Sequence, residues 1–149
     1  MAQSDLSIVP LEFHDALNIF KRLRQGDVLE ARYSGFTTDR LPECCTKTSY
    51  ALKIDNDPVA MFGTHEFTEH VSVWFYATDR LIETGTVFTR VARQFLQDAA
   101  DEYADKDLIV FVWVGADDNI RWLERLGFEY SGFDFVTPDT LFHILQFKG

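Results

Sequence analysis

The sequence has few cysteines and no long apolar run, and each scarcity excludes a class of protein. The two cysteines, Cys44 and Cys45, are adjacent, so they cannot join distant parts of the chain and we expect no disulfide framework. Small, partly buried residues on a helix explain this pair more simply than a reactive thiol does. No apolar stretch approaches the roughly 20 residues that cross a bilayer, so we expect no membrane span.

Basic residues are also scarce. The chain has 14 Lys and Arg residues against 24 Asp and Glu residues, which gives a formal net charge of −10. Non-specific nucleic-acid binding needs Lys and Arg to neutralise phosphates, so we expect neither nucleic acid nor an anionic membrane as a partner. A local anion site, such as one for coenzyme A, is still compatible with an acidic protein. The segment from Met1 to Asp5 lacks the features of a secretory signal, which predicts a cytoplasmic location.

Apolar and aromatic residues are abundant. With 149 residues, 46% of them hydrophobic and 15% aromatic, the chain is predicted to form a single globular domain over residues 1–149. Apolar periodicity predicts strands near 5–9, 50–54, 59–64, 71–76, 108–114, 128–135 and 141–147, and helices near 13–23, 27–32, 40–46, 86–103 and 119–126. This order predicts an α/β fold with a mixed central sheet flanked by helices. The helix at 86–103 should connect two parallel strands, and residues 108–114, apolar at every position, should form a fully buried strand.

The segment from Asn119 to Phe128 is the most informative part of the sequence. Ile120, Leu123 and Leu126 share one helical face, Gly127 ends the helix, and an aromatic strand follows. This pattern, together with the order of elements over nearly the whole chain, resembles the GNAT (GCN5-related N-acetyltransferase) superfamily. The resemblance implies the acyl-CoA N-acyltransferase fold.

Three shorter stretches, at 59–63, 77–79 and 120–123, further resemble small GNAT-like proteins of tailed bacteriophages. Some of those proteins are internal virion or virion-assembly proteins. This second resemblance implies phage or host proteins as partners. It also implies a location in the host cytoplasm or in the virion.

GNAT proteins bind the pyrophosphate of acetyl-CoA at an Arg/Gln-x-x-Gly-x-Gly/Ala turn that leads into the long helix. In the matching register, Ile82 replaces the basic residue, Val87 replaces the small residue, and Glu83 adds a negative charge. The resemblance makes Arg80, Gly85, Thr86 and Asn119 the candidates for binding acetyl-CoA, with Arg90 and Arg93 as further cations. The simpler alternative is that Asp79 or Thr84 caps the helix while Gly85 shapes the loop.

Groups for proton transfer are sparse. Active GNAT members often carry a tyrosine acid at the position of Leu123, and leucine cannot donate a proton. The candidates for a base are Glu66, Glu69, Asp79 or a group that acts through water, and Tyr130 is a further candidate for proton transfer. Solvated surface explains the acidic residues more simply, and strand packing explains Tyr130 more simply. His65 and His70 are five residues apart rather than at the i, i+4 helical spacing of metalloproteases, so we predict a polar turn and no metal.

Two functions follow from these observations. The first is a GNAT-like interaction protein of phage assembly or host takeover that has a degenerate acetyl-CoA site and no catalytic activity. The alternative is an acetyl-CoA-dependent N-acetyltransferase that acts on a small amine or a host protein, because positioning alone supplies much of the rate in such reactions. Leu123 and the altered turn at residues 82–87 favour the first function.

Overall fold

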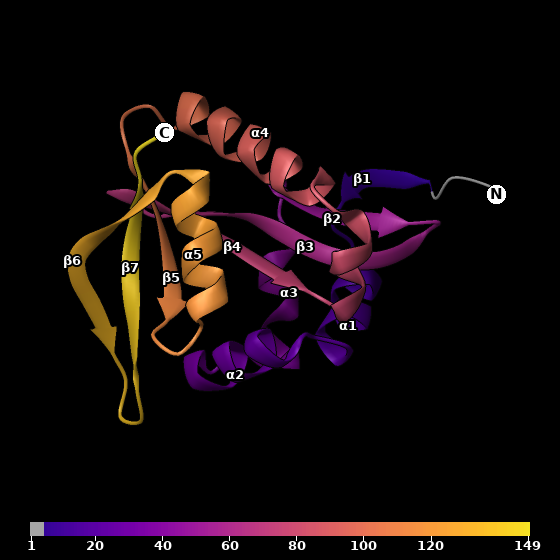
Figure 1. Ribbon diagram of the computed structural model, residues 1–149, viewed down its shortest axis with the longest axis horizontal. Helices are drawn as coiled ribbons and strands as arrows, with labels where there is room; N and C mark the ends of the chain where they lie inside the picture. Colours follow the sequence, from indigo (N-terminus) through magenta and orange to yellow (C-terminus); the bar gives the residue numbers. More distant parts are fainter. Residues whose placement is uncertain (1–4) are drawn as a thin grey trace. The chain divides into compact units, whose positions relative to one another are not determined.

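The structure, a computed structural model, describes residues 5–149 (Figure 1). The predicted absence of a secretory signal concerns residues that, apart from Asp5, lie outside this range. The strands are β1 (Leu6–Pro10), β2 (Ser49–Ile54), β3 (Asp57–Glu66), β4 (His70–Ala77), β5 (Asp107–Trp113), β6 (Phe128–Val136) and β7 (Leu141–Phe147). The helices are α1 (Phe13–Lys21), α2 (Gln25–Ser34), α3 (Leu41–Cys44), α4 (Val87–Glu102) and α5 (Asp117–Leu126), with 3-10 helices η1 (Thr38–Arg40) and η2 (Asp79–Thr84).

The seven strands form one mixed sheet in the order β1-β2-β3-β4-β5-β7-β6. The β4–β5 pair is parallel and is connected through α4, as the sequence predicts, whereas β1–β2, β2–β3, β5–β7 and β6–β7 are antiparallel. The predicted α/β fold with a mixed sheet flanked by helices is therefore confirmed. Among the described residues, no helix is long and apolar enough to cross a membrane.

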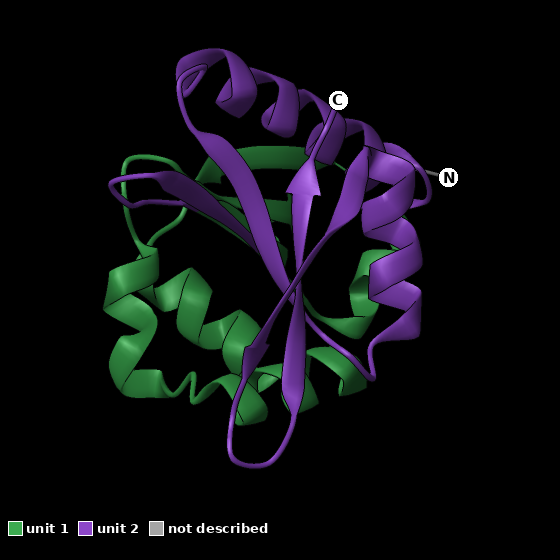
Figure 2. Ribbon diagram, turned by 90° about the vertical axis from the view of Figure 1, so that its left-hand side faces the viewer, with its two compact units in different colours: residues 1–63, 75–84 green, residues 64–74, 85–149 purple. Residues whose placement is uncertain are grey.

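The chain divides into two compact units, coloured separately in Figure 2. The first contains the described residues up to Gly63 together with residues 75–84. Its β2–β3 hairpin turns at Asp55 and Asn56, whose φ angles of 48° and 69° are typical of a type I′ turn. Its buried side chains include Ile19, Leu41 and Phe62.

Two local predictions for the first unit are wrong. The first helix ends at Lys21 rather than near Leu23, and Leu23 instead forms an isolated bridge with Thr78. The second helix is predicted to begin at Asp27, but α2 begins at Gln25. Asp27 lies inside it, and its carboxylate accepts hydrogen bonds from Arg24 and from the backbone N–H of Ala77.

The second unit contains residues 64–74 and 85–149. The carboxyl-terminal half of α4 packs on its β-strands, where Ala99 lies in one buried cluster with Val71 and Leu108. The face of α4 that is buried consists of Phe88, Ala92, Leu96 and Ala99. The expectation of a fully buried β5 is also wrong, since Phe111 is 36% exposed and only alternate residues of the strand are buried.

The segment from Asn119 to Phe128 forms the predicted helix, glycine ending and start of a strand. Helix α5 buries Leu123 and Leu126 and ends at Gly127, whose φ is 111°. A Cβ atom at Gly127 would lie 2.8 Å from the backbone carbon of Gly149, so conformation and space both require glycine here. Asn119, one of the candidates for binding acetyl-CoA, lies within α5, whose N-cap is Ala116.

Candidate functional site

The turn that leads into α4 is the one that the resemblance to GNAT proteins makes a candidate for binding pyrophosphate. Here η2 is followed by Gly85, which has a φ of 58°, and by Thr86, the N-cap of α4. No heavy atom lies within 4 Å of where a Cβ atom on Gly85 would be, so its positive φ rather than crowding favours glycine. Thr86 makes no side-chain cap hydrogen bond, and the first turn of α4 contains no acidic residue. The positive end of the α4 dipole is therefore not neutralised by its own first turn.

The simpler interpretation of this turn was a cap at Asp79 or Thr84, and it is wrong. Both residues belong to η2, and the Thr84 hydroxyl donates its hydrogen bond to the carbonyl oxygen of Leu81, at 2.7 Å. The backbone entering α4 thus remains uncapped by these side chains.

Arg80 is held by two carboxylates. Its Nε and Nη2 atoms donate to Glu83 at 2.8 and 3.0 Å, and its Nη1 atom donates to Asp57 at 2.6 Å. Asp57 also accepts a hydrogen bond from Arg22, at 2.9 Å. Arg80, the candidate cation for binding pyrophosphate, therefore already forms ion pairs with two carboxylates of the chain itself.

Both carboxylates around Arg80 are stabilised in their charged form. The hydrogen bond from Arg80 is the largest influence on Glu83 and lowers the pKa of that carboxyl group. Desolvation of Asp57 opposes its ionisation, but the hydrogen bonds from Arg80 and Arg22 outweigh this effect and lower its pKa. At neutral pH Asp57 and Glu83 therefore balance the charges of Arg80 and Arg22, which leaves no excess positive charge in this cluster to attract a pyrophosphate.

Leu123, at the position of the tyrosine acid, is 4% exposed and belongs to the core. Its neighbour Trp122 stacks on Phe88, with ring centroids 5.5 Å apart, and its Nε1 atom donates to the Thr89 hydroxyl. These contacts join α5 to α4, and the Leu123 side chain lies in the apolar interior. The position serves packing and offers no proton donor.

Three of the proton-transfer candidates lie on two different hairpins. Glu66 ends β3, where its carboxylate pairs with the Lys106 ammonium at 2.7 Å, and Glu69 is exposed in the turn before β4. Tyr130 lies on β6, and its hydroxyl donates to Asp134 at 2.9 Å. Of the further cations, Arg93 is exposed and reaches the carbonyl oxygen of Arg125, and Arg90 is exposed.

Asp134 and His143 form a pair that the sequence analysis did not identify. The Nδ1 atom of His143 lies 2.7 Å from the Asp134 carboxylate, and these residues are directly opposite each other in the β6–β7 ladder. Hydrogen bonds from His143 and then Tyr130 lower the pKa of Asp134, and the same bond to Asp134 raises the pKa of Tyr130. The hydrogen bond to the Asp134 carboxylate thus keeps the proton on the Tyr130 hydroxyl, which makes Tyr130 a poorer acid.

The two histidines of the β3–β4 turn pack on an aromatic ring. His65 and His70 each lie with ring centroids 4.7 Å from that of Phe67. The Lys106 ammonium donates to the carbonyl oxygen of Phe67, which places a positive charge at this turn. Stacking and a nearby cation account for these histidines without a metal.

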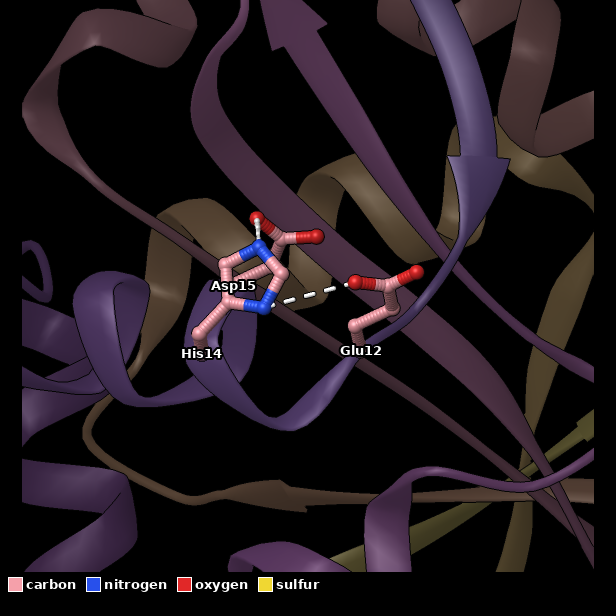
Figure 3. A group of neighbouring side chains, drawn as sticks. All are labelled: Glu12, His14 and Asp15. Atoms are coloured by element: carbon pink, nitrogen blue, oxygen red, sulfur yellow. Dashed lines mark ion pairs between the residues drawn. The ribbon is translucent and has the colours of Figure 1, made fainter.

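One group with metal-ligand atoms close together occurs among the described residues: Glu12, His14 and Asp15 at the start of α1 (Figure 3). The two ring nitrogens of His14 face different carboxylates, each at 3.3 Å, so the imidazole bridges the acids. The Asp15 carboxylate also pairs with the Lys53 ammonium at 3.3 Å. This arrangement is an ion-pair network, whereas a metal site directs its ligand atoms to one common point.

The adjacent cysteines are free thiols at the end of α3. Burial, followed by the neighbouring Cys45 and Glu43, raises the pKa of Cys44 to about 12. Burial also raises the pKa of Cys45. Neither thiol is activated toward the thiolate that reacts with electrophiles, in agreement with the structural interpretation of this pair.

No protein-family model matches the sequence, and no curated protein matches it. Solved structures do match. The GNAT-family acetyltransferase of Bacillus anthracis is 14% identical with a TM-score of 0.66, over 97% of this chain and 94% of the other. Ard1 of Thermoplasma volcanium is 11% identical with a TM-score of 0.70, over 95% of both chains. AAC(6')-Ib, solved with ribostamycin and coenzyme A, is 13% identical with a TM-score of 0.66, over 95% of this chain and 92% of the other.

This chain has the GNAT fold. The similarity extends over almost the whole of each chain and confirms the fold that the Asn119–Phe128 segment implied. At these identities the similarity concerns the fold alone, and activity has to be argued from the site.

Proposed function

We propose that this chain is a phage-encoded GNAT-fold interaction protein, associated with the virion or with a host target, whose acetyl-CoA site is degenerate. The observation that carries the proposal is the pairing of Arg80 with Glu83 and Asp57. A pyrophosphate would have to displace these carboxylates and remain beside their negative charges. In this proposal residues 1–149 act as one domain, located in the host cytoplasm or packaged in the particle, with phage or host proteins as partners.

The core position of Leu123 supports the same proposal. A protein that protonates a departing thiolate needs a donor in contact with the reacting atoms. Leu123 has no such group, and the hydroxyl of Tyr130, on the β6–β7 hairpin, donates its hydrogen bond to Asp134. A non-catalytic use of the fold requires neither group.

Titration of the protein with acetyl-CoA tests the proposal directly. We expect isothermal calorimetry to detect no binding tighter than about 1 mM, because Arg80 is already paired with Glu83 and Asp57. AAC(6')-Ib, which has been solved with coenzyme A, is the positive control for the titrant. Micromolar binding of acetyl-CoA to this chain would overturn the degenerate site.

One observation favours a second function, an acetyl-CoA-dependent N-acetyltransferase acting on a small amine or a host protein. The N-cap Thr86 makes no side-chain cap hydrogen bond, and the first turn of α4 contains no acidic residue. The positive end of this helix dipole therefore lies where the resemblance to GNAT proteins would place the pyrophosphate of the cofactor.

If this second function holds, Gly85→Trp and Arg80→Ala should each weaken acetyl-CoA binding by at least about tenfold, or ~1.4 kcal/mol. Gly35→Trp is a matched control, because Gly35 also has a positive φ, 75°, and open space around its missing Cβ. Acetyl-CoA binding that is unchanged in both test variants would place any cofactor site elsewhere on the chain.

A further inference from the structure

Exposed apolar side chains are concentrated at one end of the sheet. Four of the eleven large hydrophobic residues that are exposed among the described residues belong to β6: Tyr130, Phe133, Phe135 and Val136. Phe133 and Val136 are each 72% exposed. We call these four residues the β6 surface. Such a concentration on a chain with a net charge of −10 is typical of an interaction site rather than of scattered surface residues.

The β6 surface has side chains on both faces of the strand. Phe133 and Phe135 share one face, and the Phe135 ring meets the ring of Phe111 on β5 edge to face, at 6.0 Å. Tyr130 lies on the other face, beside Asp134 and His143. A partner that contacts both faces has to approach the edge of the strand instead of covering one face of the sheet.

The backbone of β6 is open on one side. Within residues 5–149 it is the last strand of the sheet and pairs only with β7. Its ladder is irregular between Tyr130 and Phe133 but regular from Phe133 to Val136. The strand contains no lysine and no proline, the residues that proteins commonly place on edge strands to prevent further pairing. Residues 133–136 therefore offer a regular stretch to which another strand can add.

The charge of the hairpin indicates the chemistry of that strand. Residues 128–147 contain Glu129, Asp134 and Asp139 but no Lys or Arg. A second copy of this chain would bring like charges together at the contact. A partner segment with Lys or Arg would instead complement these acids, and its apolar residues would cover the exposed aromatic rings.

We propose that the edge of β6 binds an extended segment of another protein in which apolar residues alternate with Lys or Arg. The segment adds to the sheet beside residues 133–136, and its apolar side chains contact Phe133 and Phe135. This inference names the partner chemistry for the proposed interaction role and rests on that role, but it concerns a surface separate from the Arg80 turn.

A labelled peptide of alternating lysine and valine, nine residues long like β6, is a direct probe. Fluorescence anisotropy should show saturable binding to the wild-type protein. Binding should be at least about tenfold weaker for the Phe133→Ala/Phe135→Ala double variant, a loss of ~1.4 kcal/mol. Phe67→Ala is the matched control, since Phe67 is an exposed aromatic residue (45%) of the β3–β4 turn, and it should leave binding unchanged. The double variant and the Phe67→Ala control each remove only exposed rings, so their circular dichroism spectra should match the spectrum of the wild-type protein.

Two altered peptides separate the contributions to binding. Replacing lysine by glutamate should abolish binding if charge complementarity operates. Methylating alternate backbone nitrogens should abolish it if strand pairing operates. The proposal is overturned if the double variant binds as well as the wild type, if neither peptide change matters, or if wild-type protein self-associates through β6 in sedimentation experiments. Acetyl-CoA binding measured on the same samples would refute the degenerate site while leaving the peptide result intact.

Discussion

Glu83→Gln should give the protein an acetyl-CoA affinity that calorimetry can measure. The substitution keeps the size of the side chain but removes one of the two anions that hold Arg80. Removing a unit charge within a few ångströms of a bound phosphate should strengthen binding by about tenfold, to a Kd of roughly 0.1 mM. Adding Ile82→Arg, which restores the basic residue of the GNAT turn at an 86% exposed position, should strengthen binding further.

Glu43→Gln is the matched control for this prediction. Glu43 pairs with Arg40 at the same i, i+3 spacing, 3.4 Å apart, and both side chains are exposed. It lies at α3 rather than at the turn before α4, so its removal should leave acetyl-CoA binding undetectable. If the Glu83 and Ile82 variants are also undetectable, the pairing of Arg80 is not what prevents binding, and the degeneracy lies in the backbone of the turn.

The order of elements was predictable because each element has a strong local signal. The 16-residue α4 and the α5–Gly127 ending are set by helical periodicity and by a glycine in the left-handed region. The β2–β3 hairpin was predictable from Asp55 and Asn56, which tolerate positive φ. Boundaries were less predictable where tertiary contacts compete with local preference. At Asp27, for example, the contact with Ala77 determines the role of a residue that resembles a cap.

The candidate site was only partly predictable. Two losses could be predicted from single residues, because the GNAT motifs fix their positions in the sequence. Ile82 replaces the basic residue of the pyrophosphate-binding turn, and Leu123 replaces the tyrosine acid. The pairing of Arg80 with Asp57 joins residues 23 positions apart, and no local pattern predicts it. The Asp134–His143 pair depends on the irregular register of β6 after Tyr130, and a shift of one residue would place the two side chains on opposite faces.

Asp27→Ala should destabilise the protein more than any other single polar substitution considered for this chain. The Asp27 carboxylate is 1% exposed and accepts from the Ala77 N–H at 2.8 Å and from two nitrogens of Arg24, at 3.2 and 3.1 Å. Truncation leaves the buried Ala77 N–H without this acceptor and removes the partner of a cation. These losses should lower the free energy of unfolding by about 3 kcal/mol.

A loss of that size should lower Tm by roughly 6 to 12 °C for a chain of this length. Urea unfolding and calorimetry can measure both quantities, and Asp27→Asn, which keeps an acceptor for Ala77, should recover part of the loss. Asp118→Ala is the control, because Asp118 also pairs with an arginine three residues away but is 95% exposed, so its loss should cost less than about 0.5 kcal/mol. Equal effects of Asp27→Ala and Asp118→Ala would mean that water replaces the carboxylate at Ala77. In that case the contact between α2 and the end of β4 would not depend on this buried charge.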